Sequence, residues 1–391
     1  VVLSDRNNKF KFKDMKLNKL FILYSLLGIL MTSCIQDEAL NAEADIETCT
    51  VPGDILNREP IIENDKITLI VKKGTDVTAL APKFTLTPGA TITPESGSTL
   101  DFSQPQYYEV TSEDRKWKKQ YKVEVSFSGV TNSTYSFENV KFNSGGKYQI
   151  FYETDQQGVE TMTWASGNPG FALTGVQGDH NIYPTYQYAQ GYKGKCLGLT
   201  TRKTGFLGNS VNMPIAAGNL FIGTFDVLNA LQDALKATKF GSQFEYIPTH
   251  LQGYYKYKSG ETFYILDKNS PDKLKPIPGK KDICDIYAVF YESTDDLKIL
   301  DGTNILADDN PNIIAVARID NAKETDQWLE FYLPFTFRPG KFVDQGKLEA
   351  GKYNLAIVFS SSIRGDHFEG APGSTLYIDE VKLGYDKPQE E

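Results

Sequence analysis

The chain has 391 residues, enough for two domains that each bury a hydrophobic core. Its 50 acidic residues outnumber its 41 basic ones, for a formal net charge of −9. Nucleic acid is therefore excluded as an expected partner, because binding phosphate requires a clustered positive surface. Tyrosine and phenylalanine dominate the 12% aromatic content, which fits an all-β protein.

The first feature along the chain is a short apolar segment. Met15 is followed by two lysines and an apolar run over residues 20–31, which is too short for a comfortable membrane span. The run ends at Met-Thr-Ser-Cys34, which resembles the lipobox of bacterial lipoproteins. We therefore expect a signal peptide within residues 1–33, starting at Met15, and a lipid anchor on Cys34. The acidic pair after the cysteine is similar to the surface-export signal of Bacteroidetes lipoproteins and predicts an outer-membrane protein that faces the cell exterior. An anchor in the inner leaflet or facing the periplasm is the alternative.

The next segments predict a tether and a small β-domain. Residues 34–58 are polar and patternless, which is typical of a flexible linker. Alternation in Lys66–Val71 and again over residues 117–127 predicts strands, with turns at the glycines and prolines between them. Residues 59–129 resemble the small immunoglobulin-like sandwiches that lie near the anchor of Bacteroidetes surface lipoproteins. A spacer role is expected for this domain.

Residues 130–391 predict a larger jelly-roll β-sandwich. Short apolar runs recur about every ten residues, and glycines and aromatics are frequent. The one predicted helix is Asp226–Lys239, with Asp226 as its N-cap and a glycine beyond its end. Alternation in Tyr254–Lys258 predicts one core face and one face on which a tyrosine lies among lysines. Near the C-terminus, Tyr353–Phe359 and Leu376–Leu383 predict two strands around a polar loop.

The cysteines remaining after Cys34 are Cys49, Cys196 and Cys284. Their number is odd, and no CxxC or histidine spacing suggests a metal site. Two alternatives stay open: Cys196 and Cys284 form a disulfide, or the cysteines are buried free thiols. No catalytic cysteine is indicated.

The polar loop at residues 360–374 is the main candidate site. Charged residues gather there beside glycines that allow tight turns, whereas a sugar site also needs aromatic faces. The segment 179–186 combines polar and aromatic groups and is the best partner loop. The predicted ligand-binding residues are Trp164, His180, Tyr183, Tyr186, Arg364, Asp366, His367 and Glu369. The structural alternative is a salt-bridged hairpin tip, in which Arg364 pairs with Asp366 or Glu369.

Three segments carry a family resemblance: residues 135–139 with 164–168, residues 253–257 leading to 285–291, and residues 353–383. Together they resemble the putative carbohydrate metabolism domain, a family of Bacteroidetes surface proteins, over roughly residues 131–385. The resemblance implies a jelly roll related to carbohydrate-binding modules and to some jelly-roll hydrolases. It also implies that Glu138 and Asp379 occupy positions where such domains hold a structural calcium, since first and last strands lie side by side. The alternative to a calcium site is that both acids are ordinary surface residues of strands.

These observations lead to one functional hypothesis and two alternatives. The first is a lipid-anchored surface protein that binds a glycan or polysaccharide through the jelly roll. The second is a glycoside hydrolase or lyase with Asp366 or Glu369 in a carboxylate pair, whose second member is Asp179, Glu245 or Asp285. The third is an adhesin-like structural protein that binds another protein. The identity of the glycan and of any protein partner is left open.

Overall fold

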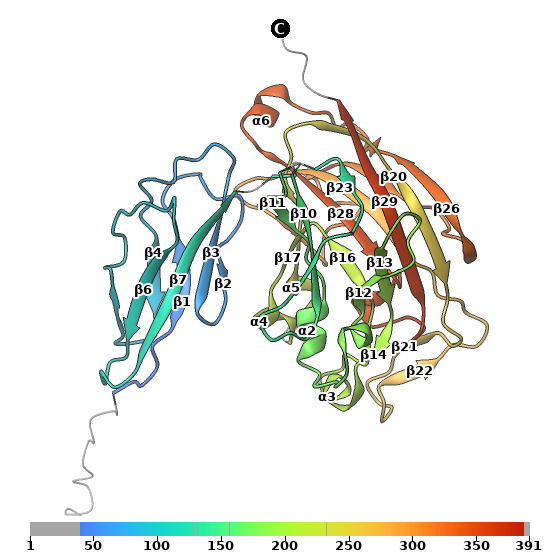
Figure 1. Ribbon diagram of the computed structural model, residues 1–391, viewed down its shortest axis with the longest axis horizontal. Coiled ribbons are helices and arrows are strands. Elements are labelled where there is room, and N and C mark those ends of the chain that lie inside the picture. The colour runs from blue at the N-terminus through green and yellow to red at the C-terminus, as the bar shows by residue number, and fades with distance from the viewer. Residues whose placement is uncertain (1–39, 128, 131, 156, 232, 387–391) are drawn as a thin grey trace, which may run out of the picture.

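The computed structural model describes residues 40–127, 129–130, 132–155, 157–231 and 233–386, which fold into two β-domains (Figure 1). The predicted signal segment and Cys34 lie outside the described residues. The all-β prediction is confirmed. No helix in the described ranges is long and apolar enough to cross a membrane.

The smaller domain is a sandwich of a five-stranded and a two-stranded sheet. The larger sheet has the order β2-β3-β7-β6-β5, in which β3 and β7 run parallel. Its strands are β2 (Ile61–Ile62), β3 (Lys66–Val71), β5 (Thr91–Thr93), β6 (Gln106–Thr111) and β7 (Lys118–Phe127). The second sheet pairs β1 (Ile46–Thr50) with β4 (Lys83–Leu86). Leu69, Tyr108 and Val123 are fully buried between the sheets.

Strand β1 corrects the predicted tether. Ile46 and Cys49 are buried in the core of the small domain, so the domain begins well before residue 59. The pairing register of β1 shifts between Ile46 and Thr48, which marks a β-bulge. Because the bulge breaks the two-residue period, the buried residues are three apart and the segment shows no strand pattern in the sequence.

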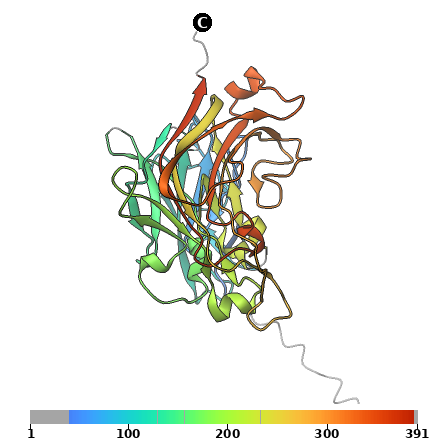
Figure 2. The same cartoon turned by 90° about the vertical axis from the view of Figure 1, so that its right-hand side faces the viewer.

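The larger domain is a jelly roll built on two facing sheets. Sheet I has the order β12-β13-β29-β20-β26, with β8 also paired to β29. Its strands are β8 (Thr134–Tyr135), β12 (Thr185–Tyr188), β13 (Cys196–Thr200), β20 (Ile247–Lys258), β26 (Thr325–Pro334) and β29 (Thr375–Asp386). The pairing of β8 with β29 confirms that the first and last strands lie side by side. The long strands of this sheet lie on the side away from the small domain (Figures 1 and 2).

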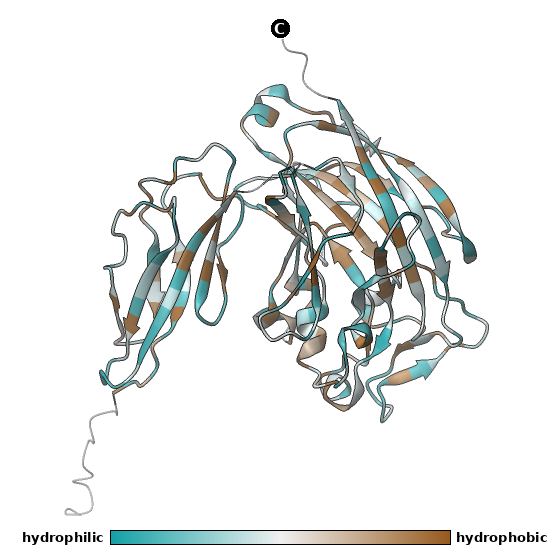
Figure 3. Ribbon diagram, viewed as in Figure 1, coloured by the Kyte–Doolittle hydropathy of each residue, from teal (hydrophilic) through white to brown (hydrophobic). Residues whose placement is uncertain are grey.

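Sheet II has the order β16-β28-β23-β25-β27, with β19 also paired to β28. Its strands are β16 (Asn219–Phe221), β19 (Ser242–Gln243), β23 (Asp285–Glu292), β25 (Ile313–Arg318), β27 (Thr336–Phe337) and β28 (Tyr353–Ser360). Leu355, Ile357 and Phe359 face sheet I in the main core, whereas Ala356 and Val358 face a second apolar cluster. Strand β28 is therefore covered on both faces, as its continuous apolar sequence predicts (Figure 3).

Shorter elements cover the edges and the outer face of sheet II. The remaining strands are β9 (Val140–Phe142), β10 (Gln149–Thr154), β11 (Glu160–Thr163), β14 (Arg202–Lys203), β15 (Ile215–Ala216), β17 (Gly223–Phe225), β18 (Thr238–Phe240), β21 (Tyr264–Leu266), β22 (Leu274–Pro276) and β24 (Leu300–Asp301). The α-helices are α2 (Asn168–Ala172), α3 (Gly205–Ser210), α4 (Val227–Ala230), α5 (Ala234–Ala237) and α6 (Gln345–Glu349). The 3-10 helices are η1 (His180–Ile182) and η2 (Gly365–His367).

The predicted helix Asp226–Lys239 is split. Helices α4 and α5 occupy parts of it, and its C-terminal end is strand β18, which pairs with both β17 and β24. Backbone groups that a single helix would bond internally are bonded to neighbouring strands instead. Cys49, Cys196 and Cys284 are free and buried, so the thiol alternative holds and the disulfide does not form.

Polar contacts join the two domains. Asn57 Nδ2 donates to Asn354 Oδ1 at 3.0 Å, and Lys352 pairs with Asp54 at 2.5 Å. Arg58 is buried at the junction, where its guanidinium donates to the carbonyl of Gly241. Burial lowers the pKa of Arg58 to about 10. A cavity of about 560 Å³, lined by both domains, borders this junction.

Candidate functional site

A cavity of about 570 Å³ lies where the outer face of sheet II meets helices α2, α3, α4 and α5. Strands β23 and β28 provide its floor through Asp285, Tyr287 and Val358. The loop that contains η2 forms another wall through Asp366 and Phe368. A pocket of this size that combines apolar walls with a few polar groups is the usual form of a small-molecule site.

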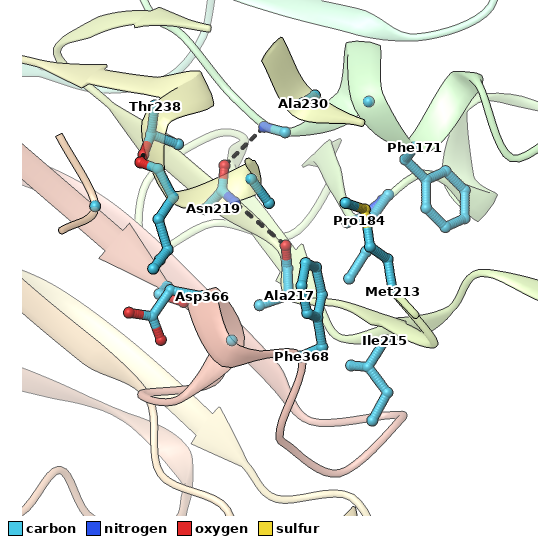
Figure 4. Close-up of a pocket in the computed structure, with 18 of the residues that line it drawn as sticks. Phe171, Pro184, Met213, Ile215, Ala217, Asn219, Ala230, Thr238, Asp366 and Phe368 are labelled. Carbon is cyan, nitrogen blue, oxygen red and sulfur yellow. Dashed lines mark hydrogen bonds between the residues drawn. The ribbon is translucent and has the colours of Figure 1, made fainter. Parts of the chain in front are cut away.

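The cavity is lined mainly by apolar side chains, with a few polar groups at separate points (Figure 4). Asp366 and Thr238 lie on one side, whereas Phe171, Met213 and Ile215 lie on the other. Asn219 lies between them, where its Oδ1 accepts from the Gly167 amide at 2.7 Å. The cavity thus offers hydroxyl-binding groups and apolar faces to one ligand.

Packing fixes the position of η2. A side chain at Gly365 would collide with the Cβ of Ala217, so the loop approaches the segment between β15 and β16 this closely only with glycine. Phe368 adopts a left-handed backbone conformation, with φ of 58°, and its side chain lines the cavity. The loop is therefore held in one arrangement rather than projecting freely into solvent.

The charged residues of the 360–374 loop pair among themselves. Arg364 Nε lies 3.2 Å from Glu369 Oε2, and Asp366 Oδ1 lies 2.7 Å from His367 Nδ1. The Arg364–Glu369 pair is the hairpin-tip alternative that the sequence suggested. Asp366 also lines the cavity, so it alone among the four charged residues predicted in this loop is part of that wall.

The predicted aromatic residues do not gather around this loop. Trp164 is 3% exposed, and its Nε1 donates to Glu153 Oε1 at 2.8 Å inside the domain. Tyr183 is buried against Phe171, and Tyr186 bonds Thr200 Oγ1 at 3.0 Å. His180 lies in η1, where its ring contacts Phe142. These side chains belong to the core or to other surfaces because packing against the sandwich outweighs their local loop pattern.

Of the three acids considered as partners of Asp366, Asp285 lines the same cavity. Arg318 binds both of its oxygens, with Nε at 3.0 Å from Oδ1 and Nη2 at 2.7 Å from Oδ2. Burial raises the pKa of Asp285, and the bonds to Arg318 oppose that shift. Glu245 instead pairs with Lys73 of the small domain, and Asp179 caps η1.

Glu138 and Asp379 converge on the turn at residues 191–195. Glu138 Oε1 accepts from the Lys195 amide at 2.8 Å, and Asp379 Oδ2 accepts from the Lys193 amide at 2.9 Å. Burial raises the pKa of Asp379 to about 6. Glu138 lies in the segment between β8 and β9, and Asp379 is fully buried in β29, so the two acids are not both surface residues of strands. Carboxylate oxygens are the ligand type that calcium takes. The described part of the chain has no group of three or more acidic, histidine or cysteine side chains arranged for a metal. The calcium site remains a proposal.

Sequence reasoning missed the cavity residues Phe171, Met213, Ile215 and Asn219. They come from segments without a helical or strand period. Residues 206–213 offered one signal of a binding site, because their apolar side chains are mixed with glycine and asparagine and follow no helical or strand period. Phe206 is 83% exposed, and the neighbouring Leu207 lines the cavity.

Comparisons with known proteins match both domains. Residues 136–384 match the model of the putative carbohydrate metabolism domain, and residues 50–125 match the SGBP N-terminal domain. No curated protein matches the chain.

Two solved structures from Bacteroides species are similar to the chain. A protein described as a putative glycoside hydrolase from Bacteroides thetaiotaomicron is 53% identical, with a TM-score of 0.76 over 90% of this chain and 99% of its own. A second, described in the same words and from Bacteroides vulgatus, is 47% identical, with a TM-score of 0.59 over 65% of this chain and 98% of its own. The chain belongs to the putative carbohydrate metabolism domain family.

Proposed function

We propose that this chain is a cell-surface protein that binds a carbohydrate in the cavity beneath helices α2 to α5. The observation that carries the proposal is that Asp366 and Asn219 share one cavity with the rings of Phe171, Tyr287 and Phe368. A sugar presents hydroxyls at its edge and C–H groups on its faces, so it requires polar and aromatic groups together. The family and the descriptions of the two relatives support a carbohydrate ligand.

The surface location is part of the same proposal. The order of two lysines, an apolar run and Cys34 supports a lipid anchor, and the small domain resembles the N-terminal domain of SGBP proteins. Contacts between Asp54 and Lys352 and between Asn57 and Asn354 hold that domain against the jelly roll. The small domain would act as a spacer between the membrane and the cavity.

Binding tests the proposal directly. Calorimetry with neutral and acidic oligosaccharides from plant, host and microbial glycans is expected to identify a ligand for the wild-type protein. Phe368→Ala and Asp366→Ala should each weaken that ligand about tenfold or more, whereas the exposed Asp309→Ala should not. If no oligosaccharide or polysaccharide binds the wild type, the proposal is wrong.

A glycoside hydrolase is the second candidate, and the shared cavity of Asp366 and Asp285 favours it. Asp366 and Asp285 would form the carboxylate pair that glycoside hydrolysis requires. Release of reducing ends from the bound glycan, lost in Asp366→Asn, would establish this reaction. Binding without release would leave a carbohydrate-binding protein.

A further inference from the structure

The outer face of sheet I carries an aromatic cluster far in sequence from the cavity loop. Tyr192 and Tyr254 stack face to face, with ring centroids 3.8 Å apart and planes 7° apart. Trp328 meets the edge of Tyr192 at 6.2 Å, and Lys256 Nζ lies 4.8 Å from the centre of the Trp328 ring. Further tyrosines extend the cluster across the sheet. We call the aromatic face the set Tyr188, Tyr192, Tyr254, Trp328, Tyr332 and Tyr377.

Strand geometry explains why these rings point outward. Along β20, Tyr255 and Tyr257 are buried in the main core, so Tyr254 and Lys256 face the opposite side. Strand pairing places Tyr377 of β29 beside Lys256, and Glu330 of β26 beside Tyr254. Rings and charged side chains therefore alternate between neighbouring strands on this face.

The turn at residues 191–195 fixes the position of Tyr192. The Lys193 amide donates to Asp379 of β29, and the Lys195 amide donates to Glu138 in the segment before β9, so the middle and the end of the turn are both held in place. Tyr192 is half exposed in this arrangement. A ligand that stacks on its free side meets a ring that is already ordered, so binding loses less conformational entropy.

The polar groups between the rings indicate what kind of ligand fits. Lys256, Lys258 and Lys382 lie on this face together with Glu330, Asp379 and Glu380, so the charges on these strands are balanced. The core of a protein–protein interface is depleted of charged residues, and a nucleic acid would require excess positive charge. Tyr192 and Tyr332 are exposed, and the other four rings are partly exposed. Rings at the surface that are interleaved with hydrogen-bonding groups of balanced charge suit a neutral sugar chain, whose rings stack while its hydroxyls bond.

The dimensions favour a polymer. Five strands spaced about 4.8 Å apart place β12 and β26 roughly 19 Å from each other, so the face is wider than a single sugar. The face belongs to sheet I, whereas the cavity lies against sheet II. The two sites are therefore separate.

We propose that the aromatic face is a second carbohydrate site, which binds an extended segment of a neutral polysaccharide by stacking on Tyr192 and Trp328. This inference rests on the proposed function and adds to it the polymeric nature of the ligand. The face holds the chain of the polysaccharide, and the cavity takes a shorter part of it.

Affinity electrophoresis separates the two sites. Gels containing a soluble neutral polysaccharide, such as β-glucan, galactomannan, xyloglucan or galactan, are run with wild type, Tyr192→Ala and Trp328→Ala. The matched controls are Tyr107→Ala and Trp117→Ala, which remove rings that are 55% and 62% exposed on the small domain. The face variants should bind the polymer about tenfold more weakly, and the controls should bind as wild type does.

A chemical readout identifies the contact independently. N-bromosuccinimide oxidises accessible tryptophans, and peptide mass spectrometry measures each one in the same sample. The retarding polysaccharide should protect Trp328, whereas Trp117 should stay reactive and the buried Trp164 should react slowly with or without it. Equal oxidation of Trp328 in both conditions would overturn the proposal.

Each outcome assigns a different failure. If the polymer retards the wild type and both face variants equally, whereas Asp366→Ala is not retarded, the proposal of a second site is wrong and the cavity remains the proposed binding site. If no polysaccharide retards the wild type and no oligosaccharide binds, both proposals fail. A wild-type dimer that Trp328→Ala dissociates, without retardation by any polysaccharide, would assign the face to a second copy of the chain.

Discussion

The carboxylate of Asp282 lies 2.6 Å from the hydroxyl of Ser362, deep beneath the loop that lines the cavity. The same oxygen accepts from Ser374 Oγ at 2.7 Å and from the Ala371 amide at 2.8 Å. One buried acid therefore ties both ends of the 360–374 loop to the segment before β23. Burial raises the pKa of Asp282, and these hydrogen bonds oppose that shift.

Replacing Asp282 should destabilise the jelly roll. Asp282→Ala leaves three buried donors without their acceptor, so we expect the free energy of unfolding to fall by about 3 kcal/mol or more. Asp282→Asn retains one oxygen and should lose less. Urea denaturation measures both, with the exposed Asp309→Ala as the control. A loss below about 0.5 kcal/mol for the alanine variant would contradict this role.

Gly365→Ala should displace the cavity wall without breaking the fold. The added methyl collides with the Cβ of Ala217, so η2 must shift, and Asp366 and Phe368 shift with it. We expect ligand affinity to fall about tenfold. Ala217→Gly removes the opposing methyl, so the double variant should recover binding. Equal affinity in all three proteins would show that this contact does not position the wall.

Stability should fall as the pH rises through the titration of Glu153. Burial raises the pKa of this acid from 4.5 to about 7, so the folded state retains a proton that the unfolded state releases. The stabilisation is complete below pH 4.5 and is lost by about pH 7, with a slope of about 1.4 kcal/mol per unit. Glu153→Gln keeps an acceptor for Trp164 and should remove this component. Thermal melts of the wild type and Glu153→Gln between about pH 5 and pH 8 test this prediction. Melting temperatures that change in parallel with pH in the two proteins would contradict it.

Calcium should raise the melting temperature if Glu138 and Asp379 hold it. Glu138→Gln removes one carboxylate and should abolish the increase, while the exposed Glu261→Gln should keep it. Melts in calcium and in a chelator provide the measurement. Equal melting temperatures in calcium and in chelator would contradict the calcium site. The two carboxylates would then serve only as hydrogen-bond acceptors for the 191–195 turn.

Regular strands could be predicted because their side chains repeat locally. Alternation identified β3, β7 and β29, and it placed Tyr254 opposite Tyr255. Strand β1 was missed because its bulge interrupts the repeat. The predicted helix at 226–239 failed because pairing of β18 with two strands outweighed helix propensity.

The site was harder to predict because its members come from distant segments. Asp366 was recognised from its local cluster, but Asn219 and Met213 join it only through tertiary packing. Trp164 was predicted as a ligand contact because a sugar site needs an aromatic face, although its indole is bonded to Glu153 in the interior. Local sequence reports which residues are polar or aromatic, whereas tertiary packing decides which of them meet.

The separation of the aromatic face and the cavity between opposite sheets has a consequence for residence time. A polymer that reaches around the sandwich would be held at two points. When one of its segments leaves its site, the other segment keeps it nearby at a high effective concentration, so it rebinds. Avidity of this kind would favour long chains over their fragments. A surface protein built in this way would retain intact polysaccharide and let shorter products leave.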